Sequence, residues 1–226
     1  PEGDEKVTLD PADFSTKIDN TYWPMVPGTQ ATFRGVDGEG SVSKITVTVT
    51  NQTKKVANGV TARVVRDTVY EDGQITEDTI DWFAQDKAGV IWYLGEDTAT
   101  YKDGKVESRE GSWEAGVDGA QAGVALPADA KRGPVYRQEY YRGHAEDNGQ
   151  VLSGHEMVDV KYGHFGSVLL TRDTTAIEPN ALEYKFYAPG VGPILTLDIS
   201  GGSDREELVK VDRVPDGTAT GPLGNP

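Results

Sequence analysis

Residues 60–84, VTARVVRDTVYEDGQITEDTIDWFA, contain the pattern that decides the fold. Two runs rich in β-branched and aromatic residues, 60–70 and 74–84, flank the dipeptide Asp72-Gly73. Asp-Gly accepts the positive φ angles that both central residues of a type I′ turn require, so this stretch predicts an antiparallel hairpin. The same turn signal recurs at three other dipeptides, Asn58-Gly59, Asp103-Gly104 and Asn148-Gly149.

Further runs of strand-forming residues lie on both sides of this hairpin, at 42–50, 90–96, 136–146, 150–162, 165–172, 182–187, 193–199 and 206–211. Segments of this length separated by tight turns are typical of a β-meander. Helical patterns are poor, and only one short turn at Asp10-Pro11 is expected. We therefore predict an all-β chain, an antiparallel meander that forms a curved sheet or a partly closed barrel. Strand should exceed about 40% of residues and helix should stay below about 12%.

The 226 residues suffice for one large β domain. We expect an N-terminal extended segment at 1–20, a single β domain at 21–211, and an extended tail rich in Pro and Gly at 212–226. Residues 111–134 hold five Gly and two Pro with little periodicity. This composition predicts a long loop, which we expect to cover the mouth of the barrel.

Acidic residues outnumber basic ones 37 to 22, and the formal net charge is −15. A field of this sign repels phosphate backbones and anionic lipid, so nucleic acid is not an expected partner. The chain has no cysteine, which excludes disulfides and cysteine nucleophiles. No stretch approaches the roughly 18 apolar residues of a membrane-spanning helix, so no transmembrane segment is predicted.

Four segments resemble bacterial extracytoplasmic proteins of the TapB type: YWPMVPGT at 22–29, VKYGHF at 160–165, FYAPGVGPI at 186–194, and the stretch from DWFAQD to IWYLGE at 81–96. The resemblance implies a lipocalin-like or half-barrel sheet and an exported or lipid-anchored protein with no established reaction. Lys161-Tyr162 departs from the Val-Pro of the family. Because the chain begins at Pro1, we expect a removed signal peptide, with a lipid anchor upstream as one form of it. The expected location is secreted, periplasmic or cell-surface.

Aromatic residues provide the candidate ligand site. A four-residue loop at 86–89 would pair Phe83 with Trp92 and Trp82 with Tyr93, which places aromatic pairs on both faces of the hairpin. Strand 136–146 has no cleanly apolar face, so it either lines a polar-aromatic cavity or forms a charged edge. The predicted ligand-binding residues are Trp82 (or Phe83), Trp92, Tyr93, Trp113, Glu114, Tyr140 and His144.

A metal site is the competing hypothesis. If Asn148-Gly149 forms a two-residue turn, His144 and His155 become diagonal neighbours about 7–8 Å apart on one face. Two imidazoles with Glu146 or Glu139 are suitable ligands for Zn²⁺ or Cu²⁺. Arg142 lies between the histidines and opposes a cation there. The alternative is an ordinary surface strand with two polar residues.

Acidic residues cluster at Asp67, Glu71, Asp72, Glu77, Asp78 and Asp81. No calcium-loop motif accompanies them, so we interpret the cluster as a solvated face. The favoured function is a non-enzymatic binding or interaction module that requires no cofactor. Its partner would be an unidentified small molecule or a cell-envelope protein. The alternatives are a metal-assisted hydrolase using His144, His155 and a carboxylate, and an assembly subunit whose extended termini pair with a neighbour.

Overall fold

The computed structural model describes residues 1–129 and 131–226 and confirms the all-β prediction, with 59% strand and one short 3₁₀ turn, η1 (Pro11–Asp13). The strands are β1 (Phe14–Ser15), β2 (Thr29–Val36), β3 (Val42–Lys55), β4 (Thr61–Glu71), β5 (Gln74–Asp86), β6 (Ile91–Lys102), β7 (Lys105–Ser108), β8 (Trp113–Glu114), β9 (Gln121–Leu126), β10 (Tyr136–Arg137), β11 (Glu139–Tyr140), β12 (Asp147–Val160), β13 (Gly163–Thr175), β14 (Leu182–Ala188), β15 (Gly192–Ser200) and β16 (Arg205–Arg213).

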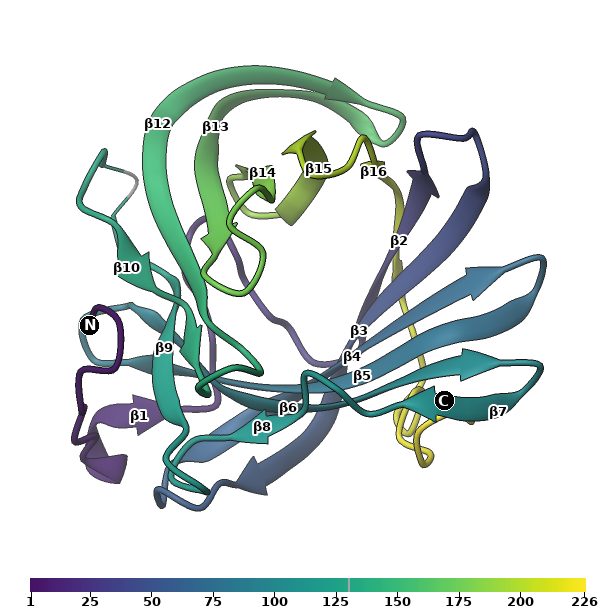
Figure 1. The fold of residues 1–226 in the computed structure, drawn as a ribbon. Helices are drawn as coiled ribbons and strands as arrows, with labels where there is room; N and C mark the ends of the chain where they lie inside the picture. The colour runs from purple at the N-terminus through teal and green to yellow at the C-terminus, as the bar shows by residue number, and fades with distance from the viewer. Residues whose placement is uncertain (130) are drawn as a thin grey trace.

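The strands form one antiparallel sheet that curls into a nearly closed barrel with a single seam (Figure 1). Their order is β10-β12-β13-β14-β15-β16-β2-β3-β4-β5-β6-β9-β11, and β1, β7 and β8 add short pairings to β5 and β6. Apart from the step from β16 to β2, the sheet between β12 and β6 follows a simple meander, as the turn signals predicted. No helix within 1–129 and 131–226 has the length and apolar character needed to cross a membrane.

The seam is bridged by residues 136–140. β10 pairs with β12 on one side, and β11 pairs with β9 on the other, so Gln138 is the point of crossing. Its backbone N–H donates to Asp147 O at 2.8 Å. The strand predicted at 136–146 was therefore wrong. Its mixed polarity belongs to a segment that changes partners halfway.

Two glycines make room for this crossing. A Cβ on Gly123 would lie 2.2 Å from Gln138 O, and a Cβ on Gly149 would lie 2.7 Å from the Tyr136 ring. The predicted turn at Asn148-Gly149 was also wrong for this reason. Gly149 lies inside β12 opposite Asp173, where it is needed for close packing and not for a positive φ. Asp72-Gly73 does form the predicted turn, with φ angles of 49° and 78°.

The predicted loop at 111–134 contains β8 and β9, so that prediction was wrong for these strands. Its small residues have a packing role: Ala120 and Ala122 are buried on the outer side of the sheet with Trp82 and Leu94. Trp113 is buried in the same cluster, at 4% exposure. Small side chains there reflect a tight fit of β9 against its neighbours.

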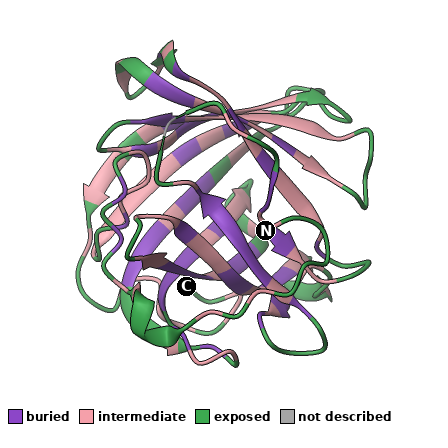
Figure 2. Ribbon diagram, turned by 90° about the vertical axis from the view of Figure 1, so that its left-hand side faces the viewer, coloured by how far each residue is buried: buried purple, intermediate pink, exposed green. Residues whose placement is uncertain are grey.

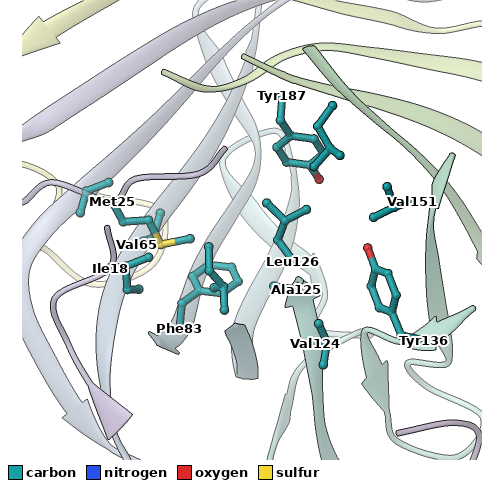
Figure 3. Packing of buried hydrophobic residues seen from close by; sticks show 13 residues of the cluster. Ile18, Met25, Val65, Phe83, Val124, Ala125, Leu126, Tyr136, Val151 and Tyr187 are labelled. Atoms are coloured by element: carbon teal, nitrogen blue, oxygen red, sulfur yellow. The ribbon is translucent and has the colours of Figure 1, made fainter. Parts of the chain in front are cut away.

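Both faces of the sheet are covered, and buried and half-buried stretches alternate along the strands (Figure 2). On β4, Ala62 and Val64 belong to the outer cluster, which the N-terminal segment covers with Val7, Leu9 and Phe14. Val65 faces the interior with residues from distant strands. Figure 3 shows part of this inner cluster, in which Leu126 of β9 and Tyr187 of β14 are turned toward each other.

Both chain ends pack against the barrel. The guanidinium of Arg137, which is 1% exposed, donates to Gly3 O and Glu5 O at 2.7 Å each. At the other end, Arg66 donates to Pro222 O at 2.8 Å and to Gly221 O at 2.5 Å. The C-terminal residues are therefore held against β4 and β5, which differs from the extended tail that their composition predicted.

Candidate functional site

The barrel contains a partly open cavity of about 530 Å³. Side chains from β2 to β6 and from β14 to β16 point into the cavity because strand residues alternate between faces. Phe33, Val47, Val65 and Leu208 supply apolar wall on four different strands. The interior therefore contains a lined hollow beside the buried inner cluster.

A strap formed by residues 16–28 lies across one end of this hollow. Asn20 Nδ2 donates to Gly89 O at 3.0 Å and to Pro127 O at 3.2 Å. Farther along, Thr21 O accepts from Gly190 N at 2.7 Å. The strap therefore connects the β5–β6 turn with the β14–β15 turn and passes inside the barrel outline (Figure 1). It brings Trp23 into the cavity wall.

An aromatic wall forms around Trp23. Its ring centroid lies 5.4 Å from that of Phe83 and 5.6 Å from that of Tyr187. Phe83 in turn stacks on Tyr93 at 4.8 Å. All four rings line the cavity. Together they give the cavity a continuous aromatic surface, which is apolar and carries partial negative charge on the ring faces.

The remaining wall is acidic. Eight carboxylates line the cavity, against one ammonium group, that of Lys185. The carboxylates belong to Asp67, Asp81, Glu139, Asp147, Glu183, Asp198, Asp204 and Glu206. Lys185 Nζ contacts Glu183 Oε2 at 3.3 Å and Asp173 Oδ2 at 3.0 Å. One ammonium group therefore faces a large excess of negative charge.

Burial and mutual repulsion raise the pKa values of the carboxyl groups near Tyr93. Burial raises the pKa of Asp81 to about 7, although the Tyr93 hydroxyl donates to its Oδ1 at 2.5 Å and opposes the shift. Burial, with the charge of Asp147, raises the pKa of Glu139 to about 8. Glu96, the register partner of Asp81, has its pKa raised to about 10 by burial and by Asp81. The pKa of Asp67 is also raised, first by burial and then by Asp81.

A second hollow of about 320 Å³ continues the cavity, because both are lined by Ile45, Asp67, Asp204 and Glu206. Its other acidic residues are Asp37, Glu71 and Glu77, and its lining contains no Lys, Arg or His among the described residues. The lining of this second hollow is therefore strongly acidic.

The predicted aromatic pairing was off by one residue. Asp86 N bonds to Val90 O at 3.0 Å, so Phe83 pairs with Tyr93 and Ala84 pairs with Trp92. The residues that connect the two strands are 87–90, one position later than the predicted loop at 86–89, and the Asp86 carboxylate accepts hydrogen bonds from Ala88 N and Val90 N. Phe83 and Tyr93 consequently face the cavity.

Trp82 and Trp92 lie on the opposite face of the sheet. Lys54 Nζ sits 3.3 Å from the centroid of the Trp82 ring and 2.8 Å from Glu114 Oε2. Trp92 Nε1 donates to Asp86 Oδ2 at 2.9 Å. Trp113 Nε1 donates to Glu139 Oε2 at 2.7 Å, which places this indole behind the acidic wall. Among the seven residues predicted to bind ligand, Tyr93 lines the cavity.

The remaining predicted residues lie at the seam and on the surface. The Tyr140 ring centroid is 6.0 Å from the Arg137 guanidinium. His144 is exposed in a tight turn and stacks on Tyr141 at 4.5 Å, and Glu146 Oε1 accepts from Gly143 N at 2.6 Å. His155 is exposed on β12. The hairpin expected to join His144 and His155 is not formed, because Asn148 and Gly149 continue β12.

Metal binding by the histidines stays a prediction. Within residues 1–129 and 131–226, the structure contains no group of three or more His, Cys, Asp or Glu side chains close enough to hold a metal ion. His164 Nδ1 instead lies 2.6 Å from Asp159 Oδ1, at the surface.

The interior carboxylates were the main residues that sequence reasoning missed. Asp67 and Asp81 were interpreted as part of a solvated face, yet both line the cavity. Asp78 is fully buried on the other face, where it binds Arg66. The sequence did contain one indication of this: Asp81 and Phe83 are two residues apart on one strand, so their side chains lie on the same face of the sheet. Nothing in the local sequence showed that this face was enclosed.

No family model matches the chain, and no curated protein matches its sequence. Among solved structures, the fold is similar to that of a protein described as a "putative lipoprotein" from Parabacteroides distasonis, with 10% sequence identity and a TM-score of 0.44. The similarity covers 85% of this chain and 99% of that chain. The resemblance to proteins of the TapB type is not confirmed.

Proposed function

We propose that the chain is an extracytoplasmic, non-enzymatic binding module that holds a small molecule inside its barrel. The observation that carries the proposal is the cavity of about 530 Å³, with an aromatic wall and a limited set of polar groups. Hollows of about 300–1,000 Å³ with apolar walls and a few placed polar groups are typical of small-molecule sites. Barrels of this kind use the interior to hold one ligand.

The extracytoplasmic part of the proposal rests on the sequence. A net charge of −15 suits a solvated exterior surface, and a chain without cysteine is insensitive to oxidising conditions. Fractionation of cells that express the complete gene product tests it. Recovery in the envelope or the medium supports this location, and recovery in the cytosol contradicts it.

The two alternative functions receive less support. The hydrolase hypothesis needs His144 and His155 beside a bound substrate, but both are exposed and lie outside the cavity lining. The assembly hypothesis needs extended termini, but residues at both ends bond to Arg137 and Arg66 of the same chain. The binding module is therefore the function that the geometry supports best.

Titration of the full chain with the neutral dye Nile red tests the proposal. We expect saturable fluorescence enhancement, because the dye would exchange water for apolar wall. Ala31→Trp fills the cavity from β2 and should weaken binding by more than about tenfold, since it removes the volume that the ligand needs. Met157→Trp, at a position 72% exposed, is the matched control.

A second filling variant, Thr196→Trp on β15, separates loss of the cavity from loss of the fold. Circular dichroism and thermal melting check each variant before titration. No saturable binding to the unmodified chain, or equal binding by the folded filling variants and Met157→Trp, would overturn the proposal.

A further inference from the structure

Among the described residues that line the cavity, acidic side chains far outnumber basic ones. Eight carboxylates face one ammonium group across its walls. Like charges also meet directly, because Glu183 and Asp198 are register partners on β14 and β15. Opposed like charges on neighbouring strands are destabilising. Folding alone gives no reason to retain two opposed carboxylates at this position.

Asp67 gives an independent indication of what is missing. Its Oδ1 atom is shielded from solvent and accepts no hydrogen bond within the described part of the chain. A buried carboxylate oxygen without a donor is costly, and native proteins rarely leave one. Asp67 lines both hollows, so this residue lies where the two hollows meet.

The cavity wall near Asp67 is apolar and aromatic. Val65 and Val47 line the cavity on β4 and β3, and Asp67 is the register partner of Val47. Trp23, Phe83 and Tyr187 then form the ring surface described above. Aromatic faces attract ammonium groups as well as alkyl chains. The site therefore offers carboxylates to a positive charge and rings to an apolar body.

We infer that the cavity binds an organic cation, an ammonium group attached to an apolar chain, with Asp67 and Asp81 as its main charge partners. This assignment rests on the proposed function and specifies its ligand class. The ammonium group supplies hydrogen-bond donors to the carboxylates that line the cavity, and its charge offsets the acidic excess. The alkyl chain displaces water from the aromatic wall. The acidic second hollow raises the local concentration of cations on the way in.

Three probes of equal length test the assignment: octylammonium, octanol and octanoate, measured by calorimetry on the full chain at pH 7.5. Octylammonium should bind at least about tenfold more tightly than octanol, because its hydrogen bonds to carboxylates are charge-assisted. Octanoate should bind most weakly. Octyltrimethylammonium, which cannot donate hydrogen bonds, separates recognition by carboxylate hydrogen bonds from recognition by aromatic rings.

Two isosteric variants locate the charge partner. Asp67→Asn and Asp81→Asn should each reduce the preference for octylammonium over octanol to less than about threefold, because each removes a charge-assisted partner. Asp97→Asn changes the net charge equally but alters an exposed pair with Arg109, so it should preserve the preference.

Equal affinity for octylammonium and octanol overturns the assignment, and so does an equal loss in Asp97→Asn and Asp67→Asn. If Nile red binds but octylammonium binds no more tightly than octanol, the organic-cation assignment is rejected and the proposed binding module is retained. If neither Nile red nor any octyl probe binds, both fall.

Discussion

Asp81 of β5 and Glu96 of β6 are register partners, so two carboxyl groups face each other across adjacent strands of the barrel. The pKa of Asp81 is raised to about 7 and that of Glu96 to about 10, in both cases first by burial. Such a pair retains protons that free carboxyl groups have lost at neutral pH. The barrel is therefore destabilised by its own interior as the pH rises.

Stability should fall between pH 5 and pH 9. The folded chain holds protons above the ordinary pKa values of 3.8 for Asp and 4.5 for Glu, whereas the unfolded chain releases them there, so the free energy of unfolding decreases with pH. The decrease should end above about 7 for Asp81, about 8 for Glu139 and about 10 for Glu96. The groups that act on these three carboxyls are Glu77, Tyr93, Trp113 and Asp147, together with the three themselves.

Urea unfolding at intervals across this range measures the effect. Glu96→Gln should flatten the profile and raise stability at pH 8, since it removes the ionisation that opposes folding. Glu178→Gln, on an exposed loop residue, is the control and should leave the slope unchanged. Stability that rises from pH 5 to pH 9 contradicts this account of the interior.

Trp113→Ala should lower the free energy of unfolding by about 3–5 kcal/mol, as truncation of a buried Trp does. The indole is 4% exposed, contacts Tyr93 edge-on at 5.3 Å and bonds to Glu139. Met157→Ala should stay within about 0.5 kcal/mol because Met157 is exposed. Hydrogen exchange should show amide protection in β9 similar to that in β5. Rapid exchange throughout 111–126, with a small loss in Trp113→Ala, would favour a mobile lid.

Gly149→Ala should cost about 1–3 kcal/mol, because the new methyl group would lie 2.7 Å from the Tyr136 ring and force the seam apart. Gly166→Ala is the matched control on the adjacent strand, since a Cβ there meets no atom within 4 Å. Urea midpoints of the two variants provide the comparison. Equal effects would show that the crossing at the seam tolerates an added side chain.

Arg66→Met should destabilise the chain by about 3–5 kcal/mol, because it leaves Asp78 buried without its charge partner. Arg66 and Asp78 are 1% and 0% exposed, and Gly224 N also donates to Asp78 at 2.6 Å. Arg109→Met removes an exposed pair with Asp97 and should cost at most about 1 kcal/mol. Similar losses for both variants would mean that the C-terminal residues do not depend on this pair.

Much of the strand order could be predicted because its signals are local. Asp72-Gly73 and Asp103-Gly104 specify tight turns by their positive φ angles, and the runs between such turns are the strands observed. The seam could not be predicted in this way. The chain changes strand partners at Gln138 because β12 and β9, which are distant in sequence, meet there. Gly123 and Gly149 leave room for this contact because they have no side chain.

The candidate site was harder to predict because both faces of the sheet are covered. Val64 and Val65 are both apolar, as are Trp82 and Phe83, so alternation alone does not identify the inner face. A shift of one residue in the 86–90 turn then exchanges inward and outward residues. In the observed register Phe83 and Tyr93 line the cavity, and Trp82 and Trp92 lie on the other face of the sheet.

A crystal structure of the full chain with 8-bromooctylammonium tests the central claim most directly, since the anomalous signal of bromine marks the end of the alkyl chain. The account predicts the nitrogen within about 3.2 Å of a carboxylate oxygen of Asp67 or Asp81, and bromine against the rings of Trp23, Phe83 or Tyr187. Bromine at the acidic wall with the nitrogen elsewhere, or a ligand bound only outside the barrel, would contradict it.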